Sequence, residues 1–413
     1  MIGKKYIVIC LCSVLCGGVK AQNNQLQYYI DRALQNSPLL KDIQNQVALN
    51  RYDSLLIKAA IKPQVTGSSF NSYSPQVKGY GYDAAITNGG NFNALVGVNK
   101  QLPDKKSLAT RFQDLQLQSR SLNNSAKINE QDLKRNIIAQ YITAFGSLQQ
   151  LNFNKEVIQL LSKEEVILKK LTQGNVYKQS DYLAFLVTLQ QQVLFVKQLN
   201  IQYRNDLATL NYLSGITDTS TVMLLNPGLN TSTLPVIPQT AVFRQFEIDS
   251  LKFINNKKLV DINYRPKLNL FADAGFNSTL AYSPYKNFGT SVGISLVVPI
   301  YDGKQRKLQY SKIDIAEKTR ANYQSFFITQ YQQQIAQLMQ QLVATDELIT
   351  DINNQLKYTQ SLIDVNGKLL EAGEVRVADY ILAINNYINA KNLITQNTIS
   401  RLLIINQLNY WNK

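Results

Sequence analysis

Two different periods of apolar residues alternate along this chain. Between residues 328 and 370, mostly apolar side chains recur at spacings of three and four, as on a helix with one buried stripe. This stripe comprises Ile328, Tyr331, Ile335, Leu338, Leu342, Thr345, Ile349, Ile352, Leu356, Thr359, Ile363, Asn366 and Leu370. No proline interrupts residues 306–370, so the pattern predicts one helix of about 65 residues with a coiled-coil seam.

A second stripe of the same kind lies about 150 residues earlier in the sequence. It comprises Leu186, Leu189, Val193, Val196, Asn200, Tyr203, Leu207 and Leu210. Near the start of the chain, Leu26, Ile30 and Ala33 set a helical period, and Ser37-Pro38 marks the start of a further helix that reaches Pro63. The chain is therefore predicted to be mainly α-helical.

Four segments instead alternate with a period of two, which predicts strands with one apolar face. They lie at residues 65–73, 92–99, 268–277 and 292–298, and the first has the weakest pattern. Strands of about 9 to 11 residues with this alternation match the wall of a transmembrane β-barrel, apolar toward lipid and polar toward a lumen. A soluble, half-buried sheet has the same alternation, so the strands alone leave both interpretations open.

The two halves of the chain repeat one another. Asp181-Tyr182-Leu183 recurs as Asp379-Tyr380-Ile381, and Gly174 before the first motif recurs as Gly373 before the second. The offset is 198 for the aspartates and 199 for the glycines. The sequence predicts four parts: a signal peptide at 1–21, a first repeat at 22–213, a linker at 214–240 and a second repeat at 241–413. Each repeat is expected to contain helix, two strands and a long helical hairpin.

Four strands per chain cannot close a barrel, and a membrane does not tolerate open sheet edges. If the strands span a membrane, several copies must combine them. Three copies would supply about twelve strands, a size within the range of known barrels. A tunnel of helices would then continue from this trimeric barrel.

Composition excludes most catalytic and metal chemistry. The sequence contains no histidine, and its three cysteines, Cys10, Cys12 and Cys16, all fall near the start. Lys4, Lys5 and an apolar run before Ala21 indicate a secretory signal cleaved after Ala21, although acylation of Cys16 is an alternative. A mature chain without this segment has no thiol, no disulfide and no Cys or His metal ligand. Carboxylates, Ser, Tyr and Lys remain, but no constellation of them stands out, so we expect no enzyme activity, no cofactor and no metal site.

The formal net charge of the chain is +15. Its basic residues are dispersed along the predicted helices among Gln and Asn. An exported protein seldom meets nucleic acid, so we interpret this charge as a solvated helical surface and expect no nucleic-acid partner.

Several short motifs, in order, resemble the TolC-like family of outer-membrane efflux proteins over nearly the whole mature length. The motifs are Leu26, Ile30, Ala33, Asn36 and Pro38; Lys62-Pro63-Gln64; Pro266-Lys267-Leu268 with Phe271-Ala272-Asp273-Ala274-Gly275; and Gly293-Ile294-Ser295-Leu296 with Pro299-Ile300-Tyr301-Asp302-Gly303. The resemblance implies a homotrimer with one 12-stranded barrel in the outer membrane and a helical tunnel in the periplasm. It also implies a periplasmic adaptor protein and an inner-membrane transporter as partners, in efflux or type I secretion, with outer-membrane lipid around the barrel.

The resemblance further implies a site at the two helical turns, where the tunnel closes and meets the adaptor. The residues expected there are Gly174, Asn175, Asp181, Gly373 and Glu374.

Asp379 matches a position where relatives place a pore-facing aspartate, and Arg376 is a candidate base to offset its charge. Relatives can carry a second aspartate three residues later, where this chain has Leu382. Capping of a helix is the simpler role for Asp379 and for Asp181.

One function of another class stays open at this point. The chain could be an exported coiled-coil scaffold or adhesin with a small soluble sheet. The cargo of a channel cannot be read from generic polar side chains in a lumen.

Overall fold

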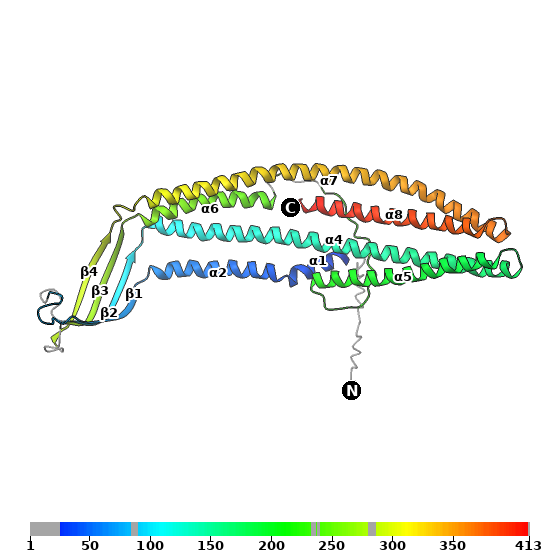
Figure 1. Ribbon diagram of the computed structural model, residues 1–413. Helices are drawn as coiled ribbons and strands as arrows, with labels where there is room; N and C mark the ends of the chain where they lie inside the picture. Colours follow the sequence, from blue (N-terminus) through cyan, green and yellow to red (C-terminus); the bar gives the residue numbers. More distant parts are fainter. Residues whose placement is uncertain (1–24, 84–89, 233–236, 238–239, 280–285, 412–413) are drawn as a thin grey trace, which may run out of the picture. The chain divides into compact units, whose positions relative to one another are not determined.

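The computed structural model describes residues 25–83, 90–232, 237, 240–279 and 286–411 (Figure 1). The predicted signal peptide and the three cysteines lie outside these ranges, as do parts of the linker and of the two strand-connecting loops. Among the helices in the described ranges, none is both long enough and apolar enough to cross a membrane.

The described chain begins with two helices, and the second helix has its own start signal. Helix α1 spans Gln25–Asn36 and α2 spans Pro38–Ala60. The Ser37 hydroxyl accepts a hydrogen bond from the Leu40 N–H, and Pro38 occupies the first helical position. Proline is suited to that position because no intrahelical bond needs its missing N–H. The helix start predicted at Ser37-Pro38 is confirmed.

Two very long helices follow the strands, one in each half of the sequence. Helix α4 spans Lys105–Gln173 and leads into α5 at Gln179–Ser214, whereas α7 spans Gln305–Ala372 and leads into α8 at Val377–Tyr410. The predicted uninterrupted helix is confirmed by the 68 residues of α7. Every member of its predicted stripe is buried or partly buried.

The stripe predicted for α5 is wrong at one position. Asn200 is exposed, whereas the preceding Leu199 is only 8% exposed. A step of three followed by a step of four leads from Val196 through Leu199 to Tyr203, and the reverse order leads through Asn200. Both orders fit a helix of 3.6 residues per turn, and burial of the leucine decides between them.

All four predicted strands are present and form one antiparallel sheet in the order β1-β2-β3-β4. The strands are β1 at Gln64–Tyr73, β2 at Gly90–Leu102, β3 at Lys267–Ser278 and β4 at Phe288–Val297. In the register, Val98 lies opposite Ala272, which in turn lies opposite Val292. The apolar positions of neighbouring strands therefore share one face of the sheet.

The chain forms two compact units, which we call the helical unit and the sheet unit. The helical unit contains the described residues up to Asn36, residues 133–231 and residues 340–407. The sheet unit contains residues 37–132, 232–339 and the end of the chain from Leu408. Each unit combines segments from both halves of the sequence, so the compact units do not follow the boundaries of the duplication.

In the helical unit, the described part of the predicted linker packs against helices. Residues 216–231 form neither helix nor strand, yet Leu224 is buried in a cluster with Ile137, Tyr141 and Tyr203. The Tyr141 hydroxyl donates to the Leu225 carbonyl at 2.8 Å, and burial raises the pKa of Tyr141 to about 12. The linker therefore covers apolar surface of this unit.

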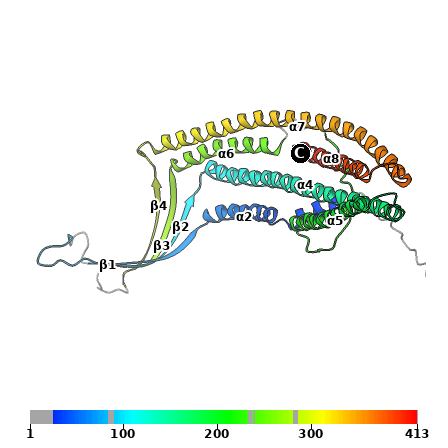
Figure 2. The same cartoon turned by 45° about the vertical axis from the view of Figure 1, so that its right-hand side comes forward.

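In the sheet unit, α6 at Ala241–Asn263 lies beside the first part of α7 in both views (Figures 1 and 2). The Thr240 hydroxyl caps α6 by accepting from the Phe243 N–H at 3.2 Å. Ser250 on α6 donates to Glu317 on α7 at 3.1 Å. Trp411, at the end of the described chain, packs edge-on against Tyr331 and so ties that end to α7.

Candidate functional site

The turn between α7 and α8 ends the long helix with a Schellman motif. Gly373 adopts a φ of 77°. Its N–H donates to the Leu370 carbonyl, and the N–H of Glu374 donates to the Leu369 carbonyl at 2.8 Å. This pattern needs a left-handed residue just past the helix, where glycine has no steric penalty.

The turn between α4 and α5 has the same geometry, but Gly174 is not its left-handed residue. Asn175 adopts a φ of 62°, and the Val176 N–H donates to the Leu171 carbonyl at 2.9 Å. Asparagine is the residue that enters this conformation most readily after glycine. Asn175 is therefore the counterpart of Gly373, and the offset between the turns is 198, as for Asp181 and Asp379.

The two turns lie against each other within the helical unit. The Tyr177 hydroxyl, from the first turn, donates to the Val375 carbonyl of the second at 2.8 Å. It also donates to the Leu370 carbonyl at 3.1 Å, and burial raises the pKa of Tyr177. A Cβ added at Gly373 would lie 2.7 Å from Cγ1 of Val176. A hydroxyl and a close apolar contact thus hold the turns together.

The structure brings Arg376 and Asp379 together in a two-pronged ion pair. Arg376 Nε donates to Asp379 Oδ2 at 2.8 Å, and Nη2 donates to Oδ1 at 2.9 Å. The carboxylate raises the pKa of Arg376, whose side chain is 84% exposed. Such an exposed pair contributes little to stability because water and salt screen it. Its main consequence is that the charge of Asp379 is compensated within one chain.

The first turn lacks this pair. Lys178 occupies the place of Arg376 and precedes α5 without a side-chain cap. Within the described part of the chain, Lys178 and Asp181 form no ion pair. Asp181 lies in the first turn of α5, where its negative charge stabilises the helix through the helix dipole. The neighbouring Tyr182 hydroxyl donates to Glu165 instead, at 2.5 Å. The turns therefore share backbone geometry and differ in ion pairing.

Sequence reasoning missed a buried polar contact behind the second turn. Tyr380 is fully buried and its ring stacks on Phe185 with an interplanar angle of 11°. Its hydroxyl lies near the carboxyl of Glu164 on α4, but the geometry leaves the hydroxyl and Oε2 of Glu164 without a hydrogen-bond partner. Burial, and then the charge of Glu371, raises the pKa of Glu164. The repeated Asp-Tyr motif pointed to Tyr380, but nothing in the sequence singled out Glu164.

In the sheet unit, the two faces of the sheet differ sharply. Ile294, Leu296 and Val292 on β4 are exposed, the last at 86%. On the opposite face, the Ser291 hydroxyl donates to Asp273 at 2.6 Å, and a Cβ added at Gly293 would collide with the ring of Phe271. No described element covers the apolar residues of β4, which form an exposed apolar row along the strand.

Comparison with known proteins gave matches among solved structures alone: no protein-family model matches the chain, and no curated protein does. The chain is similar to CusC, whose structures describe folding and transmembrane channel formation, with 14% identity, a TM-score of 0.76, and coverage of 95% of this chain and 92% of that chain. It is also similar to the outer membrane protein VceC from Vibrio cholerae, with 12% identity, a TM-score of 0.74, and coverage of 95% and 97%.

A third similar structure is the CmeC outer membrane channel of Campylobacter jejuni, with 14% identity, a TM-score of 0.71, and coverage of 94% of this chain and 85% of that chain. The chain has the TolC-like channel fold. This fold confirms the prediction of long helices combined with a four-stranded antiparallel sheet. At such low identity, the TolC-like fold defines the path of the backbone and not the cargo.

Proposed function

We propose that this chain is the outer-membrane channel of a tripartite efflux or type I secretion system. It is a passive conduit that carries small molecules or proteins from a periplasmic adaptor and an inner-membrane transporter to the exterior. The exposed apolar row of β4, opposite a polar face that carries Asp273, supports this proposal most directly. A sheet with these two faces suits lipid on one side and an aqueous lumen on the other.

The native unit under this proposal is a homotrimer. Strands β1 and β4 are the outer strands of the four-stranded sheet, so each has one edge without a strand partner in the described chain. In lipid, every backbone N–H and C=O needs a partner. Pairing β4 of one copy with β1 of the next removes all edges when three copies close a barrel of about twelve strands.

The two helical turns are the proposed inner end of the tunnel. Gly174, Asn175, Asp181, Gly373 and Glu374 are the proposed contacts with the adaptor. Their exposed or partly exposed positions are compatible with that role.

Asp379 is the proposed pore-facing carboxylate, with Arg376 as its partner. Three such pairs around one axis would form a ring whose negative charge is partly neutralised. We therefore expect weaker cation selectivity than an unpaired ring would produce.

We propose no enzymatic role. The similar structures are channel proteins. An exported scaffold or adhesin is the other class of function. It is disfavoured because a soluble sheet buries one face, whereas β4 exposes its apolar residues.

Reconstitution tests the proposed function directly. The full chain, extracted from outer membranes with detergent, should have the native mass of a trimer and produce discrete conductance steps in planar lipid bilayers. A scaffold would be released by salt without detergent. A stable monomer with intact sheet content and no conductance would refute the channel and the trimer together.

A further inference from the structure

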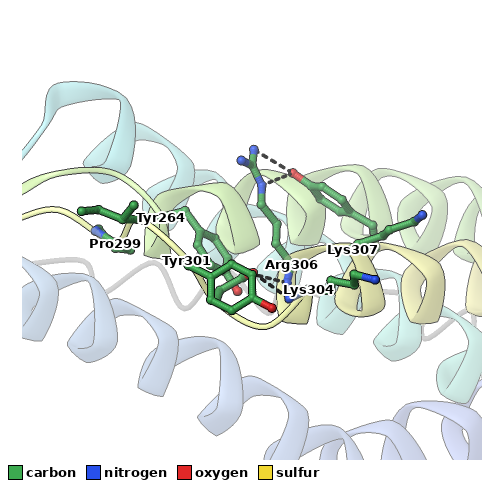
Figure 3. A pocket seen from close by; sticks show the side chains of 9 residues that line it. Tyr264, Pro299, Tyr301, Lys304, Arg306 and Lys307 are labelled. Carbon is green, nitrogen blue, oxygen red and sulfur yellow. Dashed lines mark hydrogen bonds between the residues drawn. The ribbon is translucent and has the colours of Figure 1, made fainter.

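A cleft of about 520 Å³ lies in the sheet unit where β4 leads into α7. Three tyrosines, Tyr264, Tyr301 and Tyr310, and three cationic residues, Lys304, Arg306 and Lys307, line it (Figure 3). Aromatic rings beside cationic side chains are typical of sites at a membrane–water interface. The function proposed above assigns no role to this cleft.

Two of the cationic side chains in the cleft have no internal partner. Arg306 pairs with Asp261 and donates to the Tyr310 hydroxyl. Asp302 accepts backbone N–H groups at the start of α7, which lowers the pKa of its carboxyl. By contrast, Lys304 and Lys307 form no side-chain ion pair or hydrogen bond with any described residue. The cleft therefore presents two lysines without a side-chain partner, and its lining stays net positive after the Asp302 carboxylate is counted.

These cations do not stabilise the helix on which they lie. The first turn of α7 contains Arg306 and Lys307 and no acidic residue. A positive charge at a helix N-terminus opposes the helix dipole. The counterpart helix α4 also begins with two lysines, Lys105 and Lys106. In both halves an aspartate just before the helix, Asp104 or Asp302, accepts the first N–H groups, so the following cations are not needed to stabilise the helix start.

The exposed apolar row of β4 continues to this cleft. Val298 and Ile300 follow the strand in the same alternation, and Ile300 is 96% exposed. Tyr301, the next residue, is 84% exposed. An apolar row that ends at unpaired cations matches a molecule with an apolar tail and a negatively charged head.

We propose that this cleft binds the headgroup of an anionic phospholipid, with Lys304 and Lys307 at the phosphate and Ile300 near the acyl chains. This inference rests on the proposed function, because it requires the sheet to lie in a membrane. A zwitterionic phospholipid has no net charge to pair with the lysines. Free inorganic phosphate would gain nothing from the apolar row.

The test uses the full-length protein reconstituted into lipid nanodiscs of phosphatidylcholine with or without phosphatidylglycerol. Bound phosphatidylglycerol is counted by native mass spectrometry as detergent replaces the bilayer. Each lysine near an anionic surface strengthens binding about fivefold, so Lys304→Gln with Lys307→Gln should weaken retention roughly thirtyfold. The matched control replaces the exposed Lys197 and Lys357 by glutamine and should retain phosphatidylglycerol like the native chain.

Four results would overturn the inference. Equal retention in the cleft variant and the control would show that the two lysines do not bind lipid. Displacement of phosphatidylglycerol by inorganic phosphate would indicate a plain anion site. If the cleft variant no longer forms a trimer but each chain retains as much phosphatidylglycerol as before, a neighbouring copy and not a lipid occupies the cleft.

The fourth result separates this inference from the proposed function. If the native chain neither inserts into a bilayer nor conducts across one, the proposed channel fails and the lipid site fails with it. If the native chain conducts but retains phosphatidylglycerol independently of the lysines, the channel stands and only the lipid site is refuted.

Discussion

Gly174 and Gly373, which the duplicated sequence pairs, should respond in opposite ways to substitution by alanine. Gly373 has a left-handed φ of 77°, and an added Cβ would approach Val176 to 2.7 Å. The backbone penalty is about 1–2 kcal/mol, and the forced contact costs about 1–3 kcal/mol. A more restricted unfolded chain offsets about 0.4–1 kcal/mol. Gly373→Ala should therefore destabilise the turn by roughly 2–4 kcal/mol.

Gly174→Ala is the matched control. A Cβ there would meet only the backbone carbonyls of Leu171 and Lys170, both at the ordinary contact distance of 3.6 Å. Its φ lies outside the left-handed region. Alanine should thus be neutral or stabilise the turn by up to about 1 kcal/mol.

Hydrogen exchange at the amides of the substituted turn, compared in each variant with the native chain, measures the difference. An opening made easier by 2–4 kcal/mol speeds exchange by a factor of about thirty or more. If this turn also closes the proposed tunnel, resting conductance in planar bilayers should rise for Gly373→Ala alone. The structure assigns Asn175, rather than Gly174, as the counterpart of Gly373. Equal exchange rates in the two alanine variants would refute that assignment.

Three further predictions concern the gate, the buried carboxyl and the sheet. Asp379→Ala should weaken both the preference for cations and the block by multivalent cations in single-channel recordings. Arg376→Ala should raise resting conductance. Unchanged selectivity in the Asp379→Ala channel would leave Asp379 with only its helix-capping role. Because burial raises the pKa of the Glu164 carboxyl above its ordinary value of 4.5, the folded protein holds this proton more tightly than the unfolded chain does. Its contribution to stability is therefore greatest at acid pH and declines as pH rises through the raised pKa. Glu164→Gln should remove that decline from thermal melts, and an identical pH profile would contradict it. Ile294→Lys should cost about 2–4 kcal/mol of membrane insertion whereas Ser295→Lys should be tolerated, and equal yields of inserted trimer would show that the two faces are misassigned.

The sequence by itself determined the type and order of the elements. Burial on one side of a regular helix or strand imposes a period on neighbouring residues, and that period can be read without knowing what covers the face. The long stripe through Leu338 and Ile352 and the strand around Val292 were readable for this reason. The error at Asn200 has the same origin, since two spacings fit one helical face and only packing selects Leu199.

Only the tertiary structure decided how the two halves of the sequence meet. Tyr177 donates to a carbonyl 198 residues away, and Glu164 lies beside Tyr380 although no local pattern links them. The counterpart of Gly373 also became clear from backbone dihedral angles, because asparagine can adopt the same left-handed conformation as glycine. These features depend on contacts between segments distant in sequence. Around the two turns each repeat buries surface against the other, so its own residues do not specify the partner.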